Sequence, residues 1–275
     1  MWFGKLIGAL LGLMVLGPLG LLIGLAVGHM FDRSLKQFRP ALSPAERAEA
    51  EQIFFETVFR LMGYVAKADG RVSEEEIAAA EQFMAQMRLH PEHRKQAIEH
   101  FKAGSSADFD LIAQAGRFNA IGDKLPSLRQ TVLTYLINMA LADGRLDPAE
   151  EVCLAKIAEH LGIATFVFKQ LLAMIRAQAN FHQSYQSHQQ QYAGGAQPSS
   201  ANELALAYEA LGVEASASDA VVKKAYRKLM SENHPDKLMG QGVPQDMIDM
   251  ATERAKDIQA AYDLIKKQRA AAGNS

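Results

Sequence analysis

The sequence predicts an all-α fold, and three observations support this prediction. Apolar residues recur at helical spacing along the chain, and no sustained alternation of apolar and polar residues appears through residue 180. Helix start and stop signals punctuate these stretches, with Ser43-Pro44 and Asp147-Pro148 at starts and Gly212 at an end. One helix-corner pattern also occurs twice. A chain of 275 residues has room for about two domains of ordinary size.

The composition excludes several classes of protein. The formal net charge of −2 at pH 7 provides no global positive field to collect phosphates, so we expect no nucleic-acid partner. Cys153 is the only cysteine, which excludes an intrachain disulfide and a cysteine-based zinc cluster. It lies in an apolar helical stretch with no paired histidine nearby, which favours a small core residue over a nucleophile. We expect no cofactor.

The chain begins with a segment that is long and apolar enough to cross a membrane. Residues 6–27 carry no charge. About 22 helical residues span about 33 Å, against a hydrocarbon core of about 30 Å. We therefore expect a short N-terminal tail over 1–5 and a transmembrane helix over 6–28. A cleaved signal peptide is the alternative, although its apolar core is usually shorter, at about 7–15 residues.

Charge and glycine spacing predict the orientation and packing of this segment. Lys5 is the only charge before it, whereas three basic residues follow it between 33 and 39. The positive-inside rule therefore predicts a single-pass inner-membrane protein with a periplasmic N-terminus and a cytoplasmic bulk. Two ladders of glycines spaced by four would let another helix approach closely, and a homodimer is the simplest result. The ladders are Gly4, Gly8 and Gly12, and Gly20, Gly24 and Gly28.

Residues 43–180 are predicted to form a domain of several short helices. A repeated segment, AKADGRVSEEE at 66–76 and ALADGRLDPAE at 140–150, encodes two helix–turn–helix corners. In each copy a glycine would end one helix in a left-handed conformation, and a capping box would start the next helix. The glycines are Gly70 and Gly144, and the capping boxes pair Ser73 with Glu76 and Asp147 with Glu150.

The same repeat raises the possibility of a metal site. Aligned on an EF-hand loop, each copy supplies two side-chain ligands, whereas calcium needs about six to eight oxygens. Asp69 and Asp143 are weak candidates that would share a site only if the two corners met in space. The two ADGR corners make residues 50–178 resemble the TerB-like domain of tellurite-resistance proteins and of some membrane-anchored co-chaperones. In that family acidic residues have been implicated in metal binding.

Residues 181–201 are predicted to be a flexible linker. They are rich in glutamine, serine, glycine and histidine and lack an apolar face to bury. A tether of about 20 residues has a reach of roughly 25 Å. The domain that follows could therefore search for a partner near the membrane.

Residues 202–275 are predicted to form a small helical module. A short helix at about 203–211 is followed by a second helix capped by Ser216 or Ser218, and a third helix is expected over 245–267. The second helix carries cations on the face opposite its apolar stripe. It must stop at His234-Pro235-Asp236, because proline lacks an N–H and disfavours helix in the residue before it. The cations are Lys223, Lys224, Arg227 and Lys228.

The stretches YEALGV, KKAYRKLMSENHPDK and IQAAYDLIKK closely resemble the J domain of the DnaJ family. This resemblance implies binding to a DnaK-type chaperone ATPase and acceleration of its ATP hydrolysis. It also implies that the four cations engage an acidic surface of that ATPase. The loop His234-Pro235-Asp236 would deliver the trigger, with Asp236 engaging an arginine of the partner. Two departures from the family pattern are a longer segment after Lys237 and Ala255 in place of a common phenylalanine.

The order of segments along essentially the whole chain resembles that of the DjlA-type membrane-anchored co-chaperones. The resemblance implies a co-chaperone that recruits and activates a DnaK-type ATPase at the cytoplasmic membrane face and is not itself an enzyme. A catalytic His-Asp pair is disfavoured, because no nucleophile accompanies it. The alternative function is a membrane-tethered stress sensor or adaptor acting mainly through metal or protein binding by the TerB-like domain.

Overall fold

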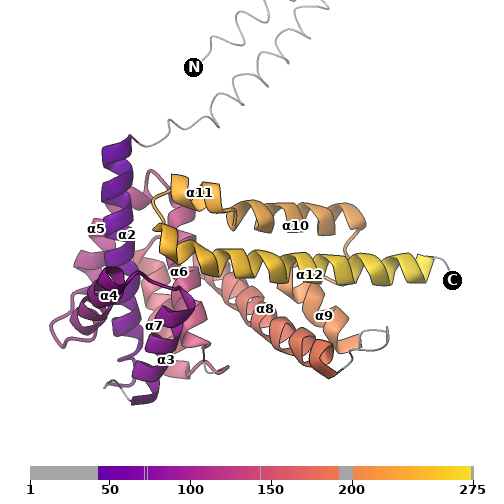
Figure 1. Ribbon diagram of the computed structural model, residues 1–275, viewed down its shortest axis with the longest axis horizontal. Coiled ribbons are helices and arrows are strands. Elements are labelled where there is room, and N and C mark those ends of the chain that lie inside the picture. Colours follow the sequence, from indigo (N-terminus) through magenta and orange to yellow (C-terminus); the bar gives the residue numbers. More distant parts are fainter. Residues whose placement is uncertain (1–42, 71, 73, 143, 192–200, 274–275) are drawn as a thin grey trace, which may run out of the picture. The chain divides into compact units, whose positions relative to one another are not determined.

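The all-α prediction is confirmed for the part of the chain that the computed structural model describes, residues 43–70, 72, 74–142, 144–191 and 201–273 (Figure 1). The predicted transmembrane helix at 6–28 and its glycine ladders lie outside these residues. No helix within the described ranges is long and apolar enough to span a bilayer. The elements are α2 (Pro44–Val65), α3 (Glu74–Gln86), α4 (Pro91–Gly104), α5 (Leu111–Gly122), α6 (Pro126–Ala140), α7 (Pro148–His160), α8 (Thr165–Gln191), α9 (Ala201–Ala210), α10 (Asp219–Glu232), α11 (Pro235–Gly240), η1 (Gln245–Met247) and α12 (Ile248–Gly273).

Helix α2 is the central helix of residues 44–191, which we call the central domain. It packs against α4, α5, α6 and α7, and half of its residues are buried. It begins at Pro44, as the Ser43-Pro44 signal predicts. The apolar core around it includes Phe54, Phe59 and Leu136, all fully buried. Cys153 is also buried in this core, and burial raises the pKa of its thiol to about 12, which fits an unreactive packing residue.

The repeated corners have the predicted local geometry where the structure describes them. Gly70 and Gly144 have φ of +108° and +83°, a conformation that glycine adopts without steric cost. At the start of α7 the Asp147 side chain accepts a hydrogen bond from the Ala149 N–H at 2.7 Å. The Glu150 carboxylate in turn accepts from the Asp147 N–H at 3.0 Å, which completes the predicted capping box. The Ser73–Glu76 box falls on side chains outside the described set.

Helix α8 differs from the flexible linker expected at 181–201, because it continues to Gln191. The reason is Phe181, the first residue of the expected linker, which is only 1% exposed and packs in a second core with α9 and α12. Nearby, the Gln178 side chain donates a hydrogen bond to the Ala210 carbonyl at 2.9 Å. Buried contacts with the following module thus stabilise a helix where the local composition suggests a coil.

The C-terminal module consists of α9, α10 and α12 around the second core, together with α11 and η1. Helices α10 and α12 pack against each other and run antiparallel (Figure 1). Val222 and Leu229 of α10 face Ile258 and Ile265 of α12 in this core. The third helix begins at Ile248 and ends at Gly273, later at both ends than the predicted range of 245–267. Residues 245–247 instead form a 3-10 turn.

Candidate interaction site

The His234-Pro235-Asp236 tripeptide, which we call the HPD motif, lies between α10 and α11. Helix α10 ends at Glu232, and the buried Asn233 closes it by donating from both its N–H and its side chain to the Leu229 carbonyl, at 3.0 and 2.9 Å. His234 is the N-cap of α11, and its Nδ1 accepts a hydrogen bond from the Asp236 N–H at 3.2 Å. The expected loop is therefore wrong in one respect: Pro235 and Asp236 begin a short helix, since proline suits its first position.

Both polar side chains of the HPD motif are open to solvent. The side chain of His234 is 59% exposed and that of Asp236 is 83% exposed, and 3.9 Å separates His234 Nδ1 from Asp236 Oδ2. A general acid or base usually works in a cleft that holds its substrate within hydrogen-bond reach, whereas this turn is open to solvent. The geometry suits contact with another molecule, because a capped backbone turn holds an imidazole and a carboxylate outward.

Four cations line one surface of α10, which we call the basic face. They occupy positions i, i+1, i+4 and i+5, so they form two neighbouring rows on the same side of the helix. Lys228 lies 3.9 Å from Glu232 in the following turn, with its side chain 74% exposed. The opposite side of α10 is anchored by Val222 and Leu229 in the second core. The exposed residues of the basic face are Lys223, Lys224, Arg227 and Lys228.

Contacts with α12 hold α10 in place. The rings of Tyr226 and Tyr262 stack with centroids 4.2 Å apart. Arg269 donates to the Tyr208 hydroxyl at 2.7 Å and to the Ala217 carbonyl at 2.6 Å, which fastens the turn before α10 to the end of α12. Sequence reasoning did not identify Arg269, because its partners Tyr208 and Ala217 lie 61 and 52 positions away along the chain.

Comparisons with known proteins agree on the organisation of the chain. Family profiles match the transmembrane domain of co-chaperone DjlA at residues 1–40, the tellurite resistance protein TerB at 55–173 and the DnaJ domain at 206–272. The chain is 39% identical to "Co-chaperone protein DjlA" of Coxiella burnetii, over 98% of both chains. Proteins with the same name from Salmonella typhimurium and Yersinia pestis are 39% and 40% identical, again over 98% of each chain. The chain belongs to the DjlA co-chaperone family. No solved structure matches it.

Family membership assigns a domain type to each part of the chain. The HPD motif and the basic face both lie within the DnaJ match at residues 206–272. A J-domain co-chaperone is a non-enzymatic activator of a partner ATPase. The match at residues 1–40 implies membrane anchoring of this DjlA-family protein.

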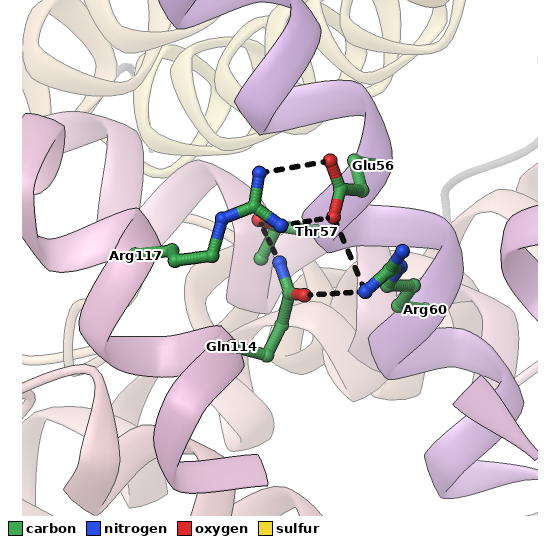
Figure 2. Close-up of polar contacts among 5 residues, drawn as sticks. All are labelled: Glu56, Thr57, Arg60, Gln114 and Arg117. Carbon is green, nitrogen blue, oxygen red and sulfur yellow. Dashed lines mark hydrogen bonds and ion pairs between the residues drawn. The ribbon is translucent and has the colours of Figure 1, made fainter. Parts of the chain in front are cut away.

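The TerB domain contains a polar cluster that sequence reasoning missed (Figure 2). Glu56 of α2 is 7% exposed and accepts hydrogen bonds from Arg117 of α5, at 2.7 and 3.3 Å, and lies 3.2 Å from Arg60. Gln114 donates to Thr57 at 2.8 Å and accepts from Arg60 at 3.3 Å. These residues largely satisfy one another, so the cluster ties α2 to α5 rather than offering free ligands.

Of the two weak candidates for metal ligands, the structure describes only one. Asp69 is exposed at the corner that follows α2, and Asp143 lies outside the described residues. The described part of the chain contains no group of three or more His, Cys, Asp or Glu side chains arranged to hold an ion.

Proposed function

We propose that this DjlA-family protein binds a DnaK-type ATPase through the basic face of its J domain and stimulates ATP hydrolysis at the cytoplasmic face of the membrane. One observation carries the proposal: an exposed imidazole and carboxylate on a capped turn directly follow a helix with four exposed cations. The match to the DnaJ domain over 206–272 supports it.

The two parts of the site have different physical roles in this proposal. The cations attract an acidic surface and orient the encounter, an effect that acts at long range and weakens with salt. His234 and Asp236 then make contacts that differ between the two conformational states of the partner. Only such differential contacts can shift an equilibrium, so the HPD motif supplies the allosteric trigger.

The test is a single-turnover ATPase measurement with a DnaK-type partner and the full chain in lipid nanodiscs. His234→Gln is expected to abolish stimulation, because it removes the imidazole that the partner contacts. His160→Gln in the TerB domain is the control, since the substitution keeps the His160 backbone carbonyl that accepts from the Asn119 side chain at 2.8 Å. Far-UV circular dichroism should be the same for both variants. Undiminished stimulation by His234→Gln would refute the role of the motif.

A further inference from the structure

The segment that follows the HPD motif packs into the core of the central domain. Its apolar side chains belong to the same buried cluster as Phe54 and Leu136 rather than to the core of the J domain. Ala251, the most exposed of them, is only 6% exposed. We call residues 238–251 the post-HPD segment. Its buried apolar members are Leu238, Val243, Met247, Ile248 and Ala251.

Residues of α2 and α6 lie close to the backbone of this segment. Gly242 has φ of +88°, and a Cβ placed on it would lie 2.8 Å from the Ala50 Cβ and 3.1 Å from the Glu51 N. The hydroxyl of Tyr135 donates a hydrogen bond to the Met247 carbonyl at 2.6 Å. Burial raises the pKa of Tyr135, so the hydroxyl stays protonated and able to donate.

A third contact joins α4 to η1. Asp246 Oδ2 lies 2.6 Å from His93 Nδ1 and accepts a hydrogen bond from the His90 N–H at 3.3 Å. Contacts from α2, α4 and α6 therefore hold the post-HPD segment along its length.

This segment is continuous with the HPD motif. The Lys237 and Leu238 N–H groups both donate to the His234 carbonyl at 3.1 Å, and the Val243 N–H donates to the Leu238 carbonyl at 3.1 Å. Leu238 is thus one helical turn from His234 while its side chain lies in the core of the central domain. A contact that holds Leu238 and Val243 also holds the turn that presents His234 and Asp236.

The junction is not packed as completely as an ordinary core. A partly open pocket of about 60 Å³ remains between α6, α8, α10, α11 and α12. Among the described residues, three side-chain atoms at this junction are buried without a hydrogen-bond partner: Gln241 Oε1, Asp246 Oδ1 and Arg254 Nε. Unpaired buried polar atoms weaken an interface, so one well-chosen substitution should open it.

We propose that the central domain, which contains the TerB match at 55–173, positions the HPD motif through the post-HPD segment, with Ala50 and Tyr135 as positioning residues. The basic face and the HPD side chains remain exposed in the docked arrangement, so docking leaves the partner-binding surface available. The role of the motif rests on the proposed function, whereas the docking itself does not.

The first experiment tests docking without any partner. Ala50→Glu, in the full chain in nanodiscs, places a long charged side chain against Gly242 without altering the J domain. Amides in peptides covering 237–247 are expected to exchange with deuterium about tenfold faster than in the unaltered chain. Ala48→Glu is the matched control, because Ala48 is exposed on the same helix, and Ala50→Gly should keep slow exchange. Unchanged exchange in Ala50→Glu would overturn the docking.

The second experiment measures ATPase stimulation as a function of co-chaperone concentration. Ala50→Glu is expected to lower maximal stimulation about fivefold while changing the half-saturating concentration less than about twofold, because the basic face is intact. If Ala50→Glu instead unfolded part of the protein, a smaller fraction of the molecules would be active. The melting curve of the variant would then show the lower stability. Fast exchange combined with full stimulation would overturn the positioning role.

A milder variant keeps the test decisive if Ala50→Glu does not fold. Tyr135→Phe removes only the hydroxyl that bonds the Met247 carbonyl, and should change exchange and stimulation in the same directions by a smaller factor. Tyr185→Phe, at an exposed tyrosine of α8, is its control. If the unaltered chain fails to stimulate the ATPase, the proposed function fails, yet the exchange data still report on docking.

Discussion

The residues of α10 fall into two groups, one buried against α12 and the other exposed to solvent. Val222 and Leu229 are buried against α12, whereas the four cations of the basic face project from the other side. The same division continues past the helix end, where Asn233 is buried and His234 is exposed. This alternation means that partner-contacting side chains can be changed without disturbing the core beneath them.

The basic face should act mainly through its charge. Exchanging Lys223 and Arg227 for glutamate is expected to weaken binding to a DnaK-type partner at about 50 mM salt, and the difference should shrink at about 300 mM salt because exposed charges are screened. Fluorescence anisotropy of a labelled partner measures both affinities. Lys267→Glu, an exposed lysine of α12, changes the charge elsewhere and serves as control. A loss of affinity that is equal at both salt concentrations would argue for a shape-based contact instead.

Two helices of the TerB domain approach one another through glycines. A Cβ on Gly63 of α2 would lie 2.0 Å from the Phe101 carbonyl oxygen, and one on Gly104 of α4 would lie 1.8 Å from the Arg60 carbonyl oxygen. The missing side chains let α2 and α4 touch backbone to backbone, as small residues do wherever helices cross closely. This contact sets where α4, and with it His93, lies relative to η1.

Alanine at either glycine should be costly, because the obstacle is backbone and cannot move aside. Gly63→Ala or Gly104→Ala is expected to lower the free energy of unfolding by about 1–3 kcal/mol or more. Gly116 of α5 is the control, since a Cβ there meets nothing within 4 Å. Gly116→Ala should raise stability by about 0.4–1 kcal/mol. Urea denaturation measures all three variants, and equal effects at the three positions would contradict the close approach.

For the whole molecule, anchoring at the N-terminus decides where the J domain can act. The match to the DjlA transmembrane domain implies the anchor, while the periplasmic N-terminus and the homodimer remain proposals from the charge and glycine patterns. If the orientation is right, a cysteine replacing Trp2 should react with a membrane-impermeant maleimide in intact cells, and one replacing Ala48 should not. The reverse labelling pattern would overturn it. The single native cysteine is buried and gives little background.

The glycine ladders offer a second test at this scale. Gly8→Leu combined with Gly24→Leu is expected to reduce self-association in detergent, because bulky side chains keep two helices apart. Leu21→Ile in the same segment is the matched control. Chemical crosslinking measures the dimer fraction, and an undiminished fraction would remove the ladders from the interface.

The sequence by itself determined features that depend on neighbouring residues. The all-α class, the capping box at Asp147, the positive φ of Gly144 and the division of α10 into two faces all follow from rules that span a few residues. The HPD motif was identified in the same way, because a proline disfavours helix in the residue before it. Its family assignment then came from residues that lie close together in the chain.

Only the tertiary structure decided how distant segments meet. Glu56 and Arg117 are 61 positions apart in the sequence, and Tyr135 and Met247 are 112 positions apart. No local sequence pattern predicts either contact. The same reason explains the error in the linker: Phe181 looks isolated in a polar stretch until α9 and α12 cover it. Burial depends on which surfaces the whole chain brings together, so the docking of the post-HPD segment on the TerB domain could be found only from the folded chain.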